Sequence, residues 1–121
     1  MKILIVDDEK TVRRALGFAL RKAGYETIEA RNYAEALELI NIHNFDLLIV
    51  DYNLPVISGF EFLEMLKRDG LKISSLIMSS NNDILKNQKN GYPLISKDLP
   101  VEKILIQIEK MLSQPKTNQR R

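Results

Sequence analysis

Short runs of branched apolar residues alternate along this chain with longer stretches in which apolar positions recur at helical spacing. The short runs predict five strands, which span Ile3–Asp8, Tyr25–Ala30, Asp46–Asp51, Ile73–Ser79 and Tyr92–Ser96. The first and third runs are nearly all apolar, which is typical of strands buried on both faces of a parallel sheet. Pro93 places the last strand at a sheet edge, because proline has no N–H to donate to a neighbouring strand.

The longer stretches predict helices, each with one apolar stripe. In the first helix the stripe consists of Val12, Ala15, Leu16, Ala19, Leu20 and Ala23. Gly24 follows at the position of a left-handed C-cap. Asn32 and Ser58 each stand three residues before a glutamate, which is the spacing of a capping box at the start of a helix. Pro100 suits the first turn of the last helix.

The alternation of strands and helices predicts the fold. It indicates an α/β domain with a doubly wound, five-stranded parallel sheet and helices on both faces. Residues 80–90 are almost wholly polar, with only Ile84 and Leu85 as apolar anchors, so the fourth helix is expected to be short or missing. We expect one domain over residues 1–113 and a disordered basic tail over residues 114–121.

Composition and charge exclude several classes of function. The chain has 121 residues and a net charge of +2, so nucleic acid is not expected as its main partner. The adjacent Arg13 and Arg14 are interpreted as a solvated helix face. The absence of cysteine excludes a disulfide framework, a zinc knuckle and a thiol nucleophile. The N-terminal apolar run is too short for a signal peptide or a membrane span, so a cytoplasmic protein is expected.

Reactive polar residues gather at the carboxyl ends of the predicted strands, where doubly wound sheets form their sites. They are Asp7, Asp8, Asp51, Ser79 and Lys97. Two of the carboxylates about 4 Å apart would repel each other by roughly 4 kcal/mol at an effective dielectric constant of about 20, so the acids imply a counter-ion. Lys97 offers one positive charge. Mg²⁺ offers two, and it favours sites with few carboxylates and several waters.

Asp51 beside a divalent cation could also act as a nucleophile toward phosphorus. The metal and Lys97 would neutralise the oxygens of the transferred phosphoryl group, and Ser79 could hydrogen-bond to one of them. A simpler interpretation makes Asp7 and Asp8 helix N-cap and first-turn acids. Acids and a lysine at matching strand ends favour the metal and phosphoryl site.

Four parts of the sequence resemble the response-regulator receiver domain, the phosphoacceptor half of two-component signalling. They are VDDE at 6–9, DYNLPVISG at 51–59, Ser79 and SKDLP at 96–100. The resemblance implies a flavodoxin-like (βα)5 fold, and transfer of a phosphoryl group to Asp51 from a sensor histidine kinase or a phosphotransfer protein. Ser79 and Lys97 would contact the acyl phosphate. The chain would not be an enzyme, beyond catalysing its own phosphorylation and dephosphorylation.

The resemblance also implies a metal site and an output. Asp8, Asp51 and the backbone carbonyl of Asn53 would bind Mg²⁺ directly, and Asp7 would act through a metal-bound water. Pro55 and Gly59 would shape the loop beside the site. Phosphorylation would switch protein–protein interactions with a downstream target, in a monomer or weak dimer. No effector domain follows within this sequence, so we expect a single-domain response regulator that does not bind nucleic acid directly.

The output half departs from the receiver pattern. Asp98 stands where receivers usually have proline after the lysine, and it could pair with Lys97 in competition with phosphate. Leu94 replaces the aromatic residue expected three positions before Lys97, and the nearest aromatic residue is Tyr92.

Three alternatives to phosphorylation-dependent switching therefore stay open. One is a phosphate-independent, pseudo-receiver binding module. Another is a phosphoryl-relay intermediate, which needs the site but little output switching. The third, a small phosphatase with an aspartyl nucleophile, is disfavoured because Asn53 stands where such enzymes place a general acid.

Overall fold

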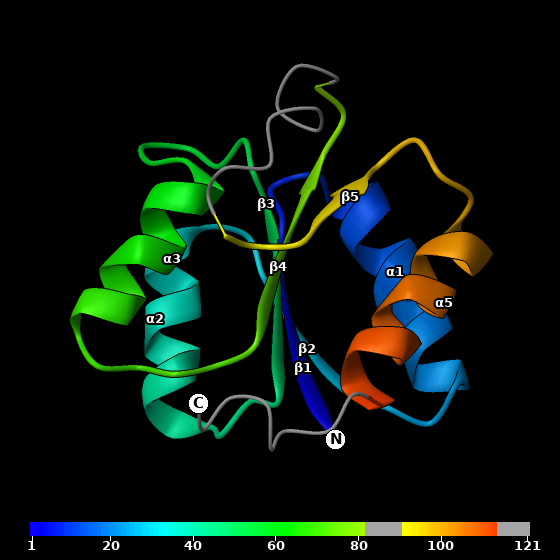
Figure 1. Cartoon of the computed structure of the whole chain (residues 1–121), viewed down its shortest axis with the longest axis horizontal. Helices are drawn as coiled ribbons and strands as arrows, with labels where there is room; N and C mark the ends of the chain where they lie inside the picture. Colours follow the sequence, from blue (N-terminus) through cyan, green and yellow to red (C-terminus); the bar gives the residue numbers. More distant parts are fainter. Residues whose placement is uncertain (82–90, 114–121) are drawn as a thin grey trace.

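One parallel sheet forms the centre of the protein, which a computed structural model describes over residues 1–81 and 91–113. Its five strands lie in the order β2-β1-β3-β4-β5 (Figure 1). They are β1 (Lys2–Val6), β2 (Glu26–Ala30), β3 (Leu47–Asp51), β4 (Ser75–Ser79) and β5 (Leu94–Ser96). All five predicted strands are present, and β5 lies at a sheet edge directly after Pro93, as predicted.

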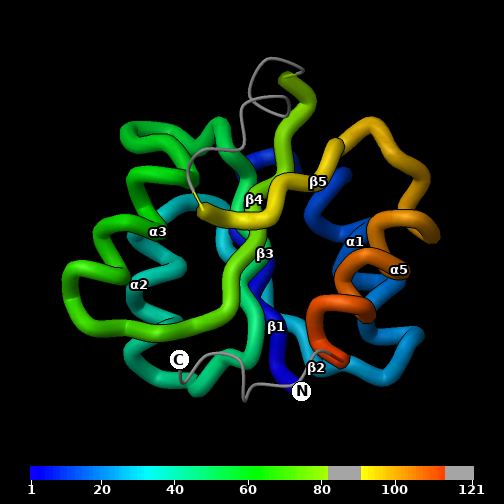
Figure 2. The backbone as a smooth tube through the Cα atoms, viewed as in Figure 1, coloured from blue at the N-terminus to red at the C-terminus, as the bar shows by residue number. Residues whose placement is uncertain are grey.

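Helices cover both faces of this sheet. Figures 1 and 2 show α2 (Tyr33–Ile42) and α3 (Gly59–Arg68) on one face, and α1 (Lys10–Lys22) and α5 (Val101–Ser113) on the other. The arrangement confirms the predicted doubly wound fold. The predictions of a short or missing fourth helix and of a disordered tail concern residues 82–90 and 114–121, which lie outside the described residues. No helix in the described part of the chain has the length and apolar character needed to cross a membrane.

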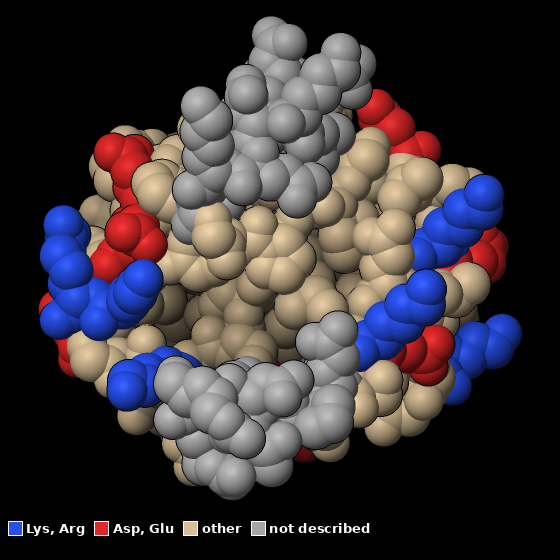
Figure 3. Space-filling view, in the orientation of Figure 1, with Lys and Arg blue, Asp and Glu red and all other residues tan. Residues whose placement is uncertain are grey.

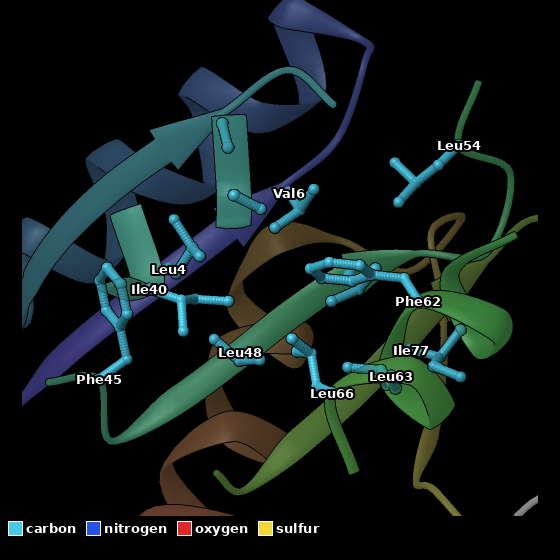
Figure 4. Close-up of a cluster of buried hydrophobic side chains, with 13 residues drawn as sticks. Leu4, Val6, Ile40, Phe45, Leu48, Leu54, Phe62, Leu63, Leu66 and Ile77 are labelled. Atoms are coloured by element: carbon cyan, nitrogen blue, oxygen red, sulfur yellow. The ribbon is translucent and has the colours of Figure 1, made fainter. Parts of the chain in front are cut away.

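Each face of the sheet packs its own apolar layer against its pair of helices. Alternate strand residues point to opposite faces, so Leu4 and Leu48 belong to the layer under α2 and α3, and Ile3 and Leu47 to the layer under α1 and α5. Figure 4 shows the first of these layers. Every residue of β3 is buried, including Asp51 at its end. The central strand therefore places a carboxylate in a buried position at its carboxyl end.

Polar caps begin α2 and α3, and one of them is a complete capping box. Ser58 Oγ accepts a hydrogen bond from Glu61 N, and the Glu61 carboxylate accepts one from Ser58 N. Asn32 Oδ1 likewise accepts from Glu35 N, but the Glu35 carboxylate accepts from Arg31 N. The predicted capping box is confirmed for α3. For α2 only the asparagine half of the prediction is right.

The buried face of α1 differs from the predicted stripe. Ala15 and Ala23 are exposed, so the prediction is wrong for these two alanines. Leu16 and Leu20 are buried as expected, but Arg13 is also buried, with 6% of its surface exposed. Arg13 Nε donates to Glu29 Oε1 at 2.9 Å, and its Nη1 donates to the carbonyl oxygen of Asp7 at 2.8 Å. The prediction of a solvated face is wrong for Arg13, because β2 supplies a carboxylate partner there. The arginine that follows it is exposed, as expected.

A cavity of about 480 Å³ opens beside α3 at the amino ends of β3 and β4. Its lining includes the apolar side chains of Leu48, Leu66 and Ile73. It lies on the face seen in Figure 3, where mostly uncharged side chains surround a hollow, and Lys67 and Lys72 also line it. The predicted reactive residues lie at the carboxyl ends of the strands, so this cavity is not part of their site.

Candidate functional site

The carboxyl ends of β1 and β3 bring two buried aspartates together. Asp7 directly follows β1, Asp51 ends β3, and each residue is 4% exposed. The chain passes from β1 to β2 on one side and from β3 to β4 on the other, so the strand order switches here. One carboxylate oxygen from each of Asp7, Asp8 and Asp51 lies within 4.8 Å of the other two. The fold therefore assembles the cluster of three acids that the sequence predicted.

Lys97 reaches these acids from the edge of the sheet. It follows β5, and its backbone N–H donates to the carbonyl oxygen of Ser79 at 3.0 Å. Its Nζ lies 3.1 Å from Asp51 Oδ2 and 3.2 Å from Asp7 Oδ2, and 8% of its side chain is exposed. A nearly buried ammonium group between two buried carboxylates offsets part of their mutual repulsion.

Backbone N–H groups orient the side chains of Asp51 and Ser79. Asp51 Oδ1 accepts a hydrogen bond from Asn53 N at 3.2 Å, which leaves Oδ2 as the oxygen that contacts Lys97. The fully buried Ser79 accepts one at its Oγ from Asn81 N at 3.0 Å. A hydroxyl that accepts in this way can still donate its hydrogen to another oxygen. Asn53 is exposed two residues beyond Asp51, in the loop where its carbonyl was predicted to bind metal.

Gly59 allows α3 to begin directly against the end of β3. A Cβ atom at this position would run into the carbonyl oxygen of Asp51. The Gly59 N–H donates to the carbonyl oxygen of Tyr52 at 2.7 Å, which closes the loop. Any residue with a side chain would therefore displace the backbone that carries Asp51. This contact gives a physical reason for the glycine that ends the DYNLPVISG stretch at 51–59.

The environment of Asp51 shifts the ionisation of its carboxyl group. Burial raises its pKa to about 6, and the charge of Asp7 acts in the same direction. Lys97 and the Asn53 N–H oppose this rise, because both stabilise the charged form. Asp51 is therefore mostly ionised at neutral pH and gains a proton in mild acid.

The environment of Lys97 keeps its ammonium group charged. Burial on its own would lower the pKa of Lys97. The hydrogen bond to Glu9 and the charges of Asp51 and Asp7 outweigh burial, so the pKa is raised overall. Lys97 is therefore a fixed positive charge over the pH range in which Asp51 titrates.

Glu9 is a site residue to which the sequence interpretation gave no role. Its Oε1 lies 2.5 Å from Lys97 Nζ. Among the described residues Lys97 pairs with Asp7, Glu9 and Asp51, and not with Asp98. The prediction that Asp98 competes for Lys97 is therefore wrong, because Asp98 is exposed and its N–H donates to Ser96 Oγ. The position of Glu9 within VDDE, directly after the two aspartates, was the available signal.

Tyr92, the aromatic residue nearest to the expected switch position, contacts α3. Its hydroxyl donates to Glu64 Oε2 at 2.8 Å, and its ring meets Phe60 edge-on with centroids 6.1 Å apart. Burial and the hydrogen bond to Glu64 raise the pKa of Tyr92 to about 12. The aromatic group before β5 is thus tied to α3, and the half-buried Leu94 stands where receivers place theirs.

Comparison with known protein families matches residues 3–109 to the response regulator receiver domain. The chain belongs to this family. The matched residues run from β1 into α5 and include all the acids at the site and Lys97. This protein is therefore a receiver domain of two-component signalling, as its motifs indicated.

Individual relatives show how far the similarity extends. The phosphate regulon transcriptional regulatory protein PhoB of Pseudomonas aeruginosa is 45% identical over 71 residues, which are 59% of this chain and 31% of PhoB. The chain thus matches about a third of the length of that regulator. Sporulation initiation phosphotransferase F of Bacillus subtilis is 34% identical over 83 residues, 69% of this chain and 67% of that protein.

A solved structure extends the likeness to nearly the whole fold. The response regulator TrrA of Thermotoga maritima, in complex with Mg²⁺–BeF, aligns with a TM-score of 0.80 and 26% identity. The alignment covers 91% of this chain and 97% of the TrrA chain. In the present receiver, the three clustered carboxylates form a hard oxygen donor set. That donor set is consistent with Mg²⁺ binding.

Proposed function

We propose that this receiver takes up a phosphoryl group on Asp51, with Mg²⁺ bound beside it, from phosphohistidine on a sensor histidine kinase or phosphotransfer protein. The observation that carries the proposal is the buried Asp51 carboxylate, which lies 3.1 Å from Lys97 Nζ and has oxygens of Asp7 and Asp8, the acids that follow β1, within 4.8 Å. A buried nucleophile, a fixed ammonium and a metal-binding donor set are the groups that phosphoryl transfer requires.

The arrangement supports a direct transfer. An ionised oxygen of Asp51 attacks phosphorus, the P–N bond to histidine breaks, and its electron pair returns to the imidazole ring. Lys97 and the Ser79 hydroxyl stabilise the phosphoryl oxygens. Bound Mg²⁺ would neutralise further negative charge there; Asp8, Asp51 and the Asn53 carbonyl would hold it directly, and Asp7 through a water. With its pKa at about 6, Asp51 is ionised at neutral pH and ready to attack.

The proposed output is a change in protein–protein contacts, and a relay is the second candidate. The relay is supported by the similarity to sporulation initiation phosphotransferase F over 69% of this chain. It is also supported at the switch position, where Leu94 replaces the aromatic residue that receivers have. The nearest aromatic side chain, Tyr92, is hydrogen-bonded to Glu64 on α3. A relay needs the phosphoryl site but not an aromatic switch.

Phosphoryl incorporation tests the proposal. Incubation with acetyl phosphate and Mg²⁺ is expected to add one phosphoryl group to the native chain, read by intact mass. Asp51→Asn removes the nucleophile but keeps the size of the side chain, so it is expected to take up none. Equal incorporation into both proteins would mean that another residue is the acceptor, and no incorporation into the native chain would contradict the proposed function.

A further inference from the structure

Glu9 occupies the N-cap position of α1 but does not cap the helix. Its side chain makes no hydrogen bond to the N–H groups of the first turn. Its carboxylate turns instead to Lys97, and at 2.5 Å this is the shortest of the three ion pairs that Lys97 makes with Asp7, Glu9 and Asp51. An N-cap acid would normally serve the helix terminus, so its engagement with a lysine from the far edge of the sheet needs a separate reason.

The backbone of Glu9 is fixed, while its carboxylate is the most accessible partner of Lys97. Glu9 N donates to Asp7 Oδ1 at 2.8 Å, and its carbonyl oxygen accepts from Arg13 N at 3.0 Å. The side chain of Glu9 is 60% exposed, whereas those of Asp7 and Asp51 are 5% and 4% exposed. Water can therefore solvate the Glu9 carboxylate when it leaves Lys97, without any movement of the backbone.

Phosphorylation changes what Lys97 must bind. An ammonium group has three N–H donors, and in this structure three carboxylates surround it. A phosphoryl group on Asp51 brings new anionic oxygens to the same ammonium. The phosphoryl group takes the place of the Asp51 carboxylate among these partners. For Lys97 to bind a second phosphoryl oxygen another partner has to leave, and Glu9 is the one that can return to solvent.

We infer that Glu9 is a latch on Lys97, which holds the ammonium in the unphosphorylated protein and competes with the phosphoryl oxygens on Asp51 for its N–H donors. This inference rests on the proposed function and assigns Glu9 a positioning role within it. The latch competes with the phosphoryl group, so it favours the unphosphorylated state. It also adds a negative charge that an anionic phosphoryl donor meets on entry.

Substitution of Glu9 tests the latch through binding as well as chemistry. Glu9→Gln keeps the shape of the side chain but loses the charge, so Lys97 is freed. We expect this variant to bind beryllium fluoride, a phosphoryl mimic, about three- to tenfold more tightly at saturating Mg²⁺, in line with a partly exposed charged contact. Fluorine NMR titration measures this affinity. Labelling by acetyl phosphate, followed by intact mass, is expected to accelerate by a similar factor.

Two further variants separate contact from charge. Asp98→Asn removes the same charge from the residue beside Lys97, but Asp98 does not pair with Lys97, so its affinity for beryllium fluoride is expected to stay near the native value. Glu9→Asp keeps the charge but shortens the side chain by one methylene, so it is expected to weaken the contact and bind the mimic more tightly than the native chain.

The outcomes distinguish the latch from the proposed function. Tighter binding in both Glu9 variants but not in Asp98→Asn supports the latch. Binding in Glu9→Gln that equals that of Asp98→Asn, or that is weaker than native, overturns it, and weaker binding would show that Glu9 supports Lys97 in the active geometry. If the native chain takes up no phosphoryl group and binds no mimic, the proposed function fails first and the latch falls with it.

Discussion

Val56 holds a backbone conformation that β-branched residues rarely adopt. Its φ is 77°, in the left-handed region, and 86% of its surface is exposed. It lies in the loop between Asp51 and Gly59, where the chain turns from β3 into α3. The left-handed conformation costs an L-residue about 1–2 kcal/mol, and little burial offsets that cost here.

Relief of this strain is expected to stabilise the protein. Val56→Asn places a residue that tolerates the left-handed region, so we expect the free energy of unfolding to rise by about 0.5–1 kcal/mol. Val56→Ala removes the β-branched side chain, but alanine still disfavours the left-handed conformation, so we expect a smaller increase in the free energy of unfolding. Urea denaturation of the three proteins measures the order. A Val56→Asn protein less stable than the native one would show that contacts of the valine outweigh its strain.

Asp51 is expected to make stability depend on pH with an unusual sign for an acid. Its folded pKa is raised to about 6, above its value of about 4 in an unfolded chain. Between about pH 4 and pH 6 the folded protein therefore holds a proton that the unfolded chain has released. The contribution of this group to stability is present below about pH 4, is lost as pH rises through about 6, and stays lost above.

The variant Asp51→Asn isolates that contribution. Without metal, it is expected to exceed the native protein in stability by on the order of 1–2 kcal/mol at pH 7. The advantage should shrink as pH falls toward about 4, because the native carboxyl is then neutral as well. Urea denaturation of both proteins at several pH values gives the difference. An advantage that is constant with pH would mean that burial does not raise the pKa of Asp51.

At the scale of elements, the sequence identifies what is local and misses what depends on distant partners. Strands, edge position and the cap of α3 follow from spacing within a few residues, and all are present. Arg13 was misplaced because the carboxylate that makes its burial possible belongs to Glu29, in another element. The role of Glu9 was missed for the same reason, since its partner Lys97 is 88 residues away. Periodicity does not record which charges meet after folding.

The acids were predictable because the parallel sheet converts a sequence pattern into proximity. Asp7 and Asp51 are far apart in the chain, but each lies at the carboxyl end of a strand of the same sheet. Their side chains therefore meet at the carboxyl end of the sheet. Lys97 follows the same rule from β5. The tie from Tyr92 to α3 was not predictable in this way, because it depends on which helix residue faces the start of β5.

At the scale of the whole molecule, the two ends of the sheet have different chemistry. The carboxyl ends gather Asp7, Asp8 and Asp51 with Glu9 around one ammonium, so this edge carries net negative charge. The amino ends open into a cavity beside α3 that is lined by apolar side chains together with Lys67 and Lys72. The parallel sheet therefore concentrates unfavourable electrostatics at one edge, where a divalent cation would relieve them.

Mg²⁺ is accordingly expected to stabilise the whole domain. A ligand that binds only the folded state adds about 2.7 kcal/mol when its concentration is about a hundred times its dissociation constant, so the melting temperature should rise with Mg²⁺ concentration. Asp8 is exposed, so Asp8→Ala is expected to fold normally while it removes most of this rise. In metal-free buffer the variant should match or exceed the native stability, because one repelling charge is gone.

A matched control shows whether the rise belongs to this edge of the sheet. Asp69 caps the other end of α3 and is exposed, so Asp69→Ala removes the same charge at the end of the helix away from Asp51. Thermal denaturation with and without Mg²⁺ is expected to give a native-like rise for Asp69→Ala and little or none for Asp8→Ala. A rise that survives in Asp8→Ala would place the ion elsewhere. The repulsion among the remaining acids would then have to be relieved by Lys97 alone.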